Sequence, residues 1–283
     1  MLNKWWSMER FRRCSKYILP FPAVLSALIC GGCRKSGTAE ASFQVMAHRG
    51  ASAYAPENTL AAMRAALEKE ADYAELDVRM TRDGLLVLMH DNSLQRCTGQ
   101  LGMVWDIRSE ILDNLEAGAW FREDFSGEPV PLLDEVIDLV RGRMKLNIEV
   151  KTSRWQLHSI EVMTQRVIEL LREKRFTEEA IVTSFDRRVV EEIEYFAPEI
   201  CTGLIFEKSY PENVFSGPWD ALSVFHETVD EEFMRKTREG GKKIYVWTVN
   251  EEDAVRKMLA LGVDGIISDK PDLVRKVYRD FQR

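Results

Sequence analysis

Two histidines, His48 and His90, each close a short apolar run, and acidic residues stand at the ends of further apolar runs. One imidazole can take a proton from an attacking oxygen while the other gives a proton to a leaving oxygen. Three carboxylates, those of Glu75, Asp77 and Glu149, can hold a divalent cation against a phosphate group. These residue types suggest metal-assisted acid/base chemistry on a phosphodiester.

The spacing of the carboxylates supports this interpretation. Glu75 and Asp77 lie two residues apart in a run with strand character, so their side chains point to the same face. Burying both without a cation would be costly or would keep one protonated, and a hard divalent ion resolves that conflict. Glu149 and Lys151 repeat the spacing on a later run. In the alternative interpretation, Glu75 and Asp77 face solvent beside Arg79, whose side chain points to the same face of the strand.

Several neighbouring residues could complete such a site. Arg49 and Lys151 would supply positive charge for a phosphate. Glu57 can orient a neighbouring side chain or join the metal site, and Asn58 is predicted to cap the helix that follows. Trp247 could form a wall against the organic part of a substrate, with core packing as the alternative.

Each histidine also has a structural alternative, in which backbone carbonyls accept the hydrogen bonds of its ring. Charged residues without an assigned role also follow strands, namely Glu207, Lys208 and Asp269.

Short β-rich runs alternate with amphipathic stretches from residue 43 almost to the end. This alternation indicates a parallel sheet with helices on its faces. A repeat of roughly 30 residues, without a glycine-rich dinucleotide motif, predicts an α/β fold of the (β/α)8 TIM-barrel type. Barrel enzymes carry their catalytic groups at the C-terminal strand ends, where both histidines are expected. The predicted strands cover 45–47, 73–79, 85–89, 145–150, 181–184, 202–206, 221–225, 243–249 and 265–267.

The predicted helices cover 59–68, 159–173, 187–196, 230–239, 251–260 and 271–281. One strand is surplus to an eight-stranded barrel, and it adjoins the turn Asp83-Gly84, which leaves no room for a helix. After this third strand, residues 92–142 are expected to form an ordered insertion over one barrel face. A short helical patch is predicted within it, near 106–115.

The composition is that of a globular protein, because 45% of the 283 residues are hydrophobic and 30% are charged. The formal net charge is -7, although the first 33 residues carry five basic side chains and one acidic one. The rest of the chain is therefore more acidic still and would repel nucleic-acid phosphates. We expect no nucleic-acid partner. A small phosphodiester would need a local basic pocket, and the sequence does not determine an oligomeric state.

The N-terminus has the pattern of a secretory signal. A basic stretch at 4–16 precedes an apolar run at 17–29, and two glycines then lead to Cys33. The apolar run is too short for a comfortable membrane-spanning helix of about 20 residues. Cys33 resembles the lipid-bearing cysteine of a bacterial lipoprotein. An ordinary cleaved signal and an uncleaved anchor are the alternatives.

These features predict three segments: a signal or lipoprotein leader at 1–33, a short tether at 34–42 and a barrel at 43–283. The expected location is the cell envelope, with a lipid anchor at Cys33 in a bacterial membrane. Without that anchor, the protein would be periplasmic or secreted.

Taken together, the motifs resemble the glycerophosphodiester phosphodiesterase family, within the phosphatidylinositol-phospholipase-C-like barrels, over about residues 45–273. The order and spacing of the matching pieces make the combination specific. The pieces are Ala-His48-Arg49-Gly50, Pro56-Glu57-Asn58-Thr59, Glu75-Leu-Asp77-Val78, His90-Asp91, Leu146-Asn-Ile-Glu149-Val-Lys151, Val246-Trp247-Thr248-Val249-Asn250 and Asp269-Lys-Pro271.

The resemblance implies metal binding by Glu75, Asp77 and Glu149, acid/base catalysis by His48 and His90, and phosphate binding by Arg49 and Lys151. It implies one Mg²⁺ or Ca²⁺ and hydrolysis of a small glycerophosphodiester to sn-glycerol 3-phosphate and an alcohol. The path could run through a cyclic phosphate or through direct attack by water. Two alternatives stay open: hydrolysis of lysophospholipids in the manner of a phospholipase D or C, and a non-catalytic envelope binding lipoprotein.

Overall fold

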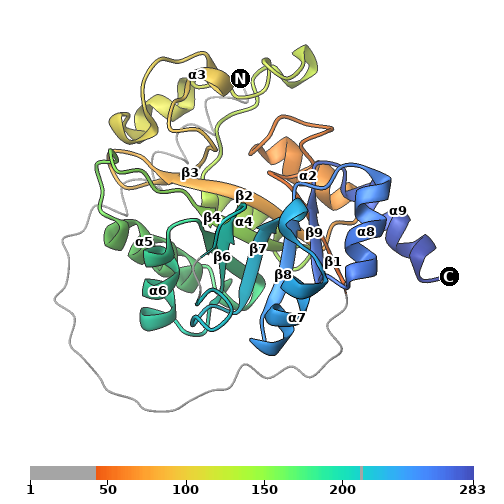
Figure 1. Cartoon of the computed structure of the whole chain (residues 1–283). Helices are drawn as coiled ribbons and strands as arrows, with labels where there is room; N and C mark the ends of the chain where they lie inside the picture. The colour runs from red at the N-terminus through yellow and green to blue at the C-terminus, as the bar shows by residue number, and fades with distance from the viewer. Residues whose placement is uncertain (1–42, 211–212) are drawn as a thin grey trace.

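The computed structural model describes residues 43–210 and 213–283 (Figure 1). Eight parallel strands close into a barrel, because β1 pairs with both β2 and β9. The predicted (β/α)8 TIM barrel is confirmed, with strand ends shifted by one or two residues. The barrel strands are β1 (Gln44–Ala47), β2 (Tyr73–Met80), β4 (Lys145–Val150), β5 (Ala180–Ser184), β6 (Cys201–Phe206), β7 (Ala221–Phe225), β8 (Lys243–Trp247) and β9 (Gly265–Ser268).

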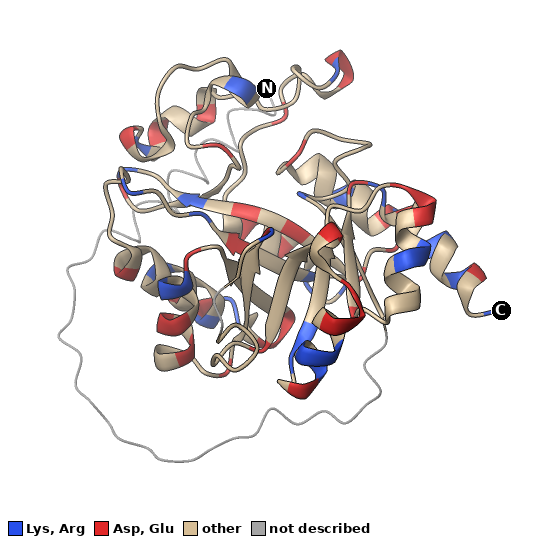
Figure 2. Ribbon diagram, in the orientation of Figure 1, with Lys and Arg blue, Asp and Glu red and all other residues tan. Residues whose placement is uncertain are grey.

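The two strands that carry most of the acidic residues of interest are neighbours. The register of β2 and β4 places Asp77 beside Glu149 and Glu75 beside Asn147. Side chains of the opposite parity, such as Leu76, belong to the apolar core formed with the helices. Figure 2 shows acidic bands on β2 in the barrel wall. Strand alternation therefore directs the carboxylates into the barrel and the aliphatic residues outward.

Helices cover the outside of the barrel (Figure 1). They are α2 (Leu60–Glu68), α4 (Leu133–Val140), α5 (Ile160–Glu173), α6 (Arg187–Phe196), α7 (Glu231–Glu239), α8 (Glu252–Leu261) and α9 (Pro271–Phe281). The placement of α4 differs from the prediction, which included its residues in the insertion. Leu133, Val136, Ile137 and Val140 recur at helical spacing and are buried, so the signal was present but masked by the irregular segment before it.

The surplus strand is β3 (Leu86–Leu88), which pairs antiparallel with β2 across the turn at Asp83. The insertion follows β3 and contains α3 (Gln95–Thr98) and the 3-10 turns Val104–Asp106, Ser109–Asn114 and Glu123–Phe125. The predicted helical patch is therefore made of 3-10 turns. Figure 1 shows the segment around α3 outside the ring of strands. Its own apolar cluster, which includes Leu94, Val104 and Leu112, keeps it ordered.

In the part of the chain that the structure describes, no helix combines the length and the apolar character needed to cross a bilayer. The predicted leader, the tether and Cys33 lie outside the described residues.

Candidate active site

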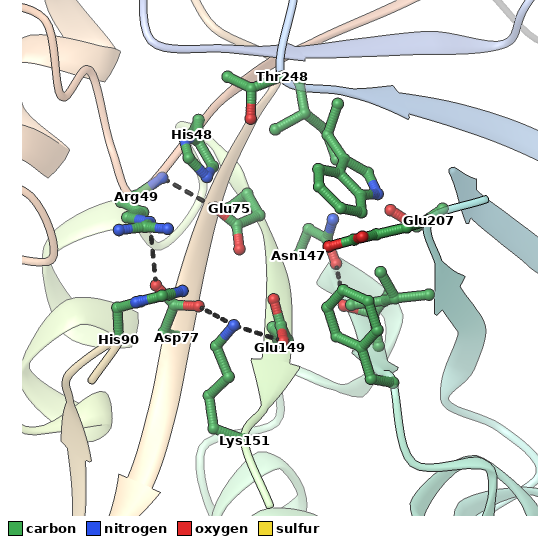
Figure 3. A pocket seen from close by; sticks show the side chains of 16 residues that line it. His48, Arg49, Glu75, Asp77, His90, Asn147, Glu149, Lys151, Glu207 and Thr248 are labelled. Atoms are coloured by element: carbon green, nitrogen blue, oxygen red, sulfur yellow. Dashed lines mark hydrogen bonds and ion pairs between the residues drawn. The ribbon is translucent and has the colours of Figure 1, made fainter. Parts of the chain in front are cut away.

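Polar side chains gather in a cavity of about 280 Å³ toward the C-terminal ends of the barrel strands (Figure 3). Its lining contains the two histidines, the three carboxylates and the two cations singled out in the sequence, and also Trp247. The fold thus brings together residues that are up to two hundred positions apart in the chain. This end of a TIM barrel is where such enzymes build their active sites.

Glu75, Asp77 and Glu149 form the acidic centre of the cavity. One carboxylate oxygen from each lies within 4.8 Å of the other two. The residues are only 5%, 1% and 7% exposed, so the interpretation in which the first pair faces solvent is wrong. Arg79 is not their partner, because its guanidinium donates to the backbone oxygen of His90 at 2.6 and 3.1 Å.

The charges in this centre are incompletely balanced by the protein. Burial opposes ionisation of Asp77, but the positive charges of Lys151 and Arg49 hold the pKa of that carboxyl below its usual range. Burial and then the negative charge of Asp77 raise the pKa of Glu75. The same causes raise the pKa of Glu149 to about 7. Three close oxygen donors of this kind fit one hard divalent cation such as Mg²⁺ or Ca²⁺.

Lys151 and Arg49 both contact the acidic centre. Lys151 Nζ lies 3.0 Å from Asp77 Oδ1 and 2.6 Å from Glu149 Oε1. Arg49 Nε lies 3.4 Å from Asp77 Oδ2, and the backbone nitrogen of Arg49 donates to Glu75 Oε2 at 2.8 Å. Figure 3 shows both cations beside the carboxylates at one side of the cavity. A phosphate that entered here would find two positive charges already aimed at its site.

A tight turn directs Arg49 into the cavity. Arg49 and Gly50 both have a left-handed backbone, with φ of 51° and 78°. Gly50 is required because a Cβ at this position would lie 2.6 Å from the Cβ of Ala62 in α2. The His48-Arg49-Gly50 sequence therefore combines two cavity side chains with the turn that presents them.

Glu57 orients arginines and is not part of the acidic centre. Its Oε1 accepts from Arg49 Nη1 at 2.9 Å, and both carboxylate oxygens accept from the guanidinium of Arg96, at 2.9 and 2.7 Å. Of the two uses suggested by the sequence, the geometry supports orientation of a neighbour. Arg96 comes from α3, so the insertion contributes to the support of the cavity.

The capping role predicted for Asn58 is wrong. Thr59 caps α2, accepting from the backbone nitrogen of Ala62. Asn58 is buried in a left-handed conformation, donates from Nδ2 to Asp77 Oδ2 at 2.8 Å and accepts from the backbone nitrogen of Asp77 at 3.0 Å. Asparagine tolerates this backbone conformation better than most residues. Its amide therefore fixes the orientation of a carboxylate in the acidic centre.

His48 is held by Asp269, a residue to which the sequence assigned no role. His48 Nδ1 lies 2.6 Å from Asp269 Oδ1, and the same carboxylate accepts from Ser52 Oγ and from Asn250 Nδ2. Burial lowers the pKa of His48, but the hydrogen bond to Asp269 and the charge of Glu75 outweigh it, so the net direction is upward. The bond at Nδ1 leaves Nε2 for a ligand in the cavity.

His90 has a similar arrangement with its neighbour in sequence. His90 Nδ1 lies 2.8 Å from Asp91 Oδ1, and Asp91 also accepts from Arg96 at 2.6 Å. Burial lowers the pKa of His90, the charge of Asp77 opposes this, and the charges of Lys151 and Arg49 add to it. Neither histidine is the backbone-satisfied ring of the structural alternative, because each has a carboxylate at Nδ1.

The opposite wall of the cavity is made by residues from β5 to β8. Trp247 and Phe185 meet edge to face with ring centroids 5.9 Å apart, and Glu207 and Thr248 lie beside them in the lining. Trp247 is half-buried, so it forms part of the wall, and its buried Nε1 meets no acceptor within the part of the chain that the structure describes. In the sequence, Glu207 stands out only as a charged residue at a strand end.

Comparison with known proteins gives a consistent result. Residues 48–273 match the Glycerophosphoryl diester phosphodiesterase family. The chain is 36% identical over 245 residues to a glycerophosphodiester phosphodiesterase of Caldanaerobacter subterraneus, covering 82% of this chain and 98% of that one. It is 31% identical over 258 residues to a glycerophosphodiester phosphodiesterase of Bacillus altitudinis, covering 84% and 99%.

Solved structures agree with the sequence relatives. A phosphodiesterase of Oleispira antarctica, solved in complex with the product sn-glycerol-3-phosphate, is 27% identical, with a TM-score of 0.78 over 83% of this chain and 96% of that one. A glycerophosphodiester phosphodiesterase of Agrobacterium tumefaciens is 30% identical, with a TM-score of 0.72 over 83% and 99%. The resemblance seen in the motifs is confirmed. The chain belongs to the glycerophosphoryl diester phosphodiesterase family, a family of phosphoric diester hydrolases.

Proposed function

We propose that this protein hydrolyses glycerophosphodiesters to sn-glycerol 3-phosphate and an alcohol, with one divalent cation and two histidines. The observation that carries the proposal is the cavity itself, in which two carboxylate-paired imidazoles face a buried triad of oxygen donors. The Oleispira relative holds sn-glycerol-3-phosphate, which is the product expected here.

Glu75, Asp77 and Glu149 would hold the cation, and Asn58 would fix the orientation of Asp77. When bound, a divalent cation lowers the pKa of a coordinated hydroxyl and offsets the charge of the phosphate. Arg49 and Lys151 would bind the remaining phosphate oxygens, exchanging part of their contact with the carboxylates for contact with the substrate.

One histidine takes the proton of the glycerol 2-hydroxyl as that oxygen bonds to phosphorus. The other histidine protonates the alcohol oxygen as its bond to phosphorus breaks. Water then opens the cyclic phosphate, with the proton transfers reversed, and the product is a phosphomonoester. In both steps, Asp269 and Asp91 keep the Nε2 atoms of the rings turned to the reacting oxygens.

The test is release of glycerol 3-phosphate from glycerophosphocholine by the purified protein. We expect EDTA to abolish the release and Mg²⁺ or Ca²⁺ to restore it, and the ion that restores it identifies the cofactor. His48→Ala and His90→Ala should each lose about two or more decades of rate. His226→Ala is the matched control, because His226 is half-buried and does not line the cavity.

Full activity in either cavity variant would refute the two-histidine mechanism. Calorimetric binding of glycerophosphocholine without turnover, with the metal supplied, would favour the non-catalytic binding protein instead.

A further inference from the structure

Arg96 belongs to the insertion, yet its guanidinium reaches two carboxylates beside the cavity. Nη1 and Nη2 donate to Glu57 at 2.9 and 2.7 Å, and Nε and Nη2 donate to Asp91 at 2.6 and 3.2 Å. All three nitrogens are used, because the planar guanidinium can meet two carboxylates at once. The side chain is 39% exposed, so these ion pairs contribute little to stability. Their effect is on the orientation of the two carboxylates.

Each of these carboxylates holds a side chain of the cavity. Glu57 Oε1 accepts from Arg49 Nη1 at 2.9 Å. Asp91 Oδ1 lies 2.8 Å from His90 Nδ1. Arg49 and His90 both line the cavity, and Figure 3 shows them on the same side of it. One guanidinium therefore stands behind a cation that would bind the phosphate and behind a ring that would move a proton.

The insertion fixes the position of Arg96 itself. Its neighbours Leu94 and Cys97 are buried and belong to the apolar cluster of the insertion. The guanidinium carbon also lies 5.7 Å from the centre of the Trp120 ring, which is a cation–π distance. The guanidinium can therefore turn away only by losing this ring contact together with its hydrogen bonds to the carboxylates.

We propose that Arg96 is a positioning residue that couples the insertion to the reaction. Through Glu57 it orients Arg49 for phosphate binding, and through Asp91 it orients the ring of His90 for proton transfer. This inference rests on the proposed function. Docking of the insertion against the barrel is then a condition for catalysis.

The experiment measures kcat and KM for glycerophosphocholine in Arg96→Met, which keeps a long side chain and removes every donor. KM should rise because Arg49 is less well oriented, and kcat should fall because His90 is less well oriented. The two changes together should lower kcat/KM about ten- to a hundred-fold. Arg96→Lys keeps the charge without the planar fork, so it should recover only part of the loss.

Two further variants separate the two paths. Glu57→Gln should mainly raise KM, and Asp91→Asn should mainly lower kcat. Arg96→Met combined with Asp91→Asn should lower kcat by less than the product of the two single effects, because both changes act through the ring of His90. Full multiplication of the two effects would contradict this path.

Arg122→Met is the matched control, because Arg122 lies in the same insertion and its guanidinium contacts Asp124 and the ring of Phe125. It should preserve both kcat and KM. A thermal melt checks that each variant is folded. The backbone of His90 is held separately by Arg79, so loss of Arg96 should leave that segment in place.

Wild-type values of kcat and KM in Arg96→Met would overturn the inference and leave the proposed function standing. A change confined to one of the two parameters would do the same. In particular, a lower kcat with an unchanged KM and a lower Tm is the result of losing folded protein, which a merely structural role would give. If the wild type releases no glycerol 3-phosphate from any diester, the proposed function fails and this inference fails with it.

Discussion

The two cavity histidines stand in different electrostatic surroundings. Both have an aspartate at Nδ1, yet the pKa of His48 is raised and the pKa of His90 is lowered. Burial favours the neutral ring in both. For His48, burial is outweighed by the bond to Asp269 together with the charge of Glu75, whereas for His90 the positive charges of Lys151 and Arg49 add to the effect of burial.

Asp269→Asn tests the role of the carboxylate behind His48. The substitution keeps the shape and removes the charge that raises the pKa of His48, so burial should then dominate and the pKa should fall. We expect kcat to drop roughly ten- to a hundred-fold. The limb of the pH–rate profile that reports His48 should move to lower pH.

Asp272→Asn serves as the control at this scale, since Asp272 bonds Tyr54 and Lys69 and does not line the cavity. If the pH–rate profile of Asp269→Asn matches that of the wild type in both kcat and the position of its limbs, Asp269 has no influence on the His48 imidazole.

At the scale of elements, the turn between β2 and β3 anchors the insertion. Asp83 accepts from the backbone nitrogen of Ser109 at 3.0 Å and from Ser109 Oγ at 2.6 Å, and also from Thr81 Oγ1. Arg96 of α3 in turn supports Glu57 and Asp91. The insertion is therefore held at two places, by Asp83 at the turn between β2 and β3 and by the contacts of Arg96 beside the cavity.

Asp83 should make this attachment sensitive to acid. Burial opposes ionisation, but the hydrogen bonds from Ser109 and Thr81 lower the pKa of Asp83. A lowered folded-state pKa contributes stability above the unfolded pKa of about 3.9, and the contribution is lost as pH falls through the folded value. Asp83→Asn should reduce stability by a few tenths to about 1 kcal/mol at neutral pH.

The difference in Tm between the wild type and Asp83→Asn, measured at neutral pH and near pH 3, checks this prediction. It should shrink as the pH falls. Asp124→Asn, an exposed site in the same insertion, should change Tm little at either pH, because surface ion pairs contribute little. A difference that is independent of pH would mean that the charge of Asp83 is not the cause.

At the scale of the whole molecule, the net charge of the chain differs from the distribution of charge in the cavity. The chain is acidic overall, whereas the cavity concentrates Arg49 and Lys151 at the place where a phosphodiester must bind. Figure 2 shows acidic and basic residues interspersed over the outer helices. Arg49 and Lys151, together with the cation proposed for the acidic centre, would therefore attract the substrate despite the acidic net charge.

We also propose that the protein is exported and anchored by a lipid on Cys33, with 34–42 as the tether. In a bacterial host with a lipoprotein pathway, the full chain should fractionate with membranes and begin at a diacylglyceryl-modified Cys33. Cys33→Ser should abolish the modification and the cleavage at residue 33 that depends on it. A mature N-terminus at any other residue, found by mass spectrometry, would contradict the anchor and favour an ordinary signal or an uncleaved segment.

The sequence by itself determined the order of the strands and of the outer helices other than α4, because alternating and helical hydrophobic patterns are local. It also determined that Glu75 and Asp77 share a face, since side chains alternate along any strand. Helix α4 was missed because the irregular insertion before it obscured the change to helical spacing. The short apolar runs before His48 and His90 also placed both histidines at strand ends.

Only the tertiary structure decided the partners of these residues. His48 meets Asp269 across 221 positions because β1 pairs with β9 when the barrel closes, and no local pattern encodes that closure. Asn58 meets Asp77 because β1 also pairs with β2, and the segment that follows β1 carries Asn58 to the end of β2. Glu207 shares the cavity with the acidic centre because β6 belongs to the same closed ring of strands as β2 and β4. Strand periodicity fixes the face on which a side chain lies, whereas barrel closure decides which side chains share the cavity.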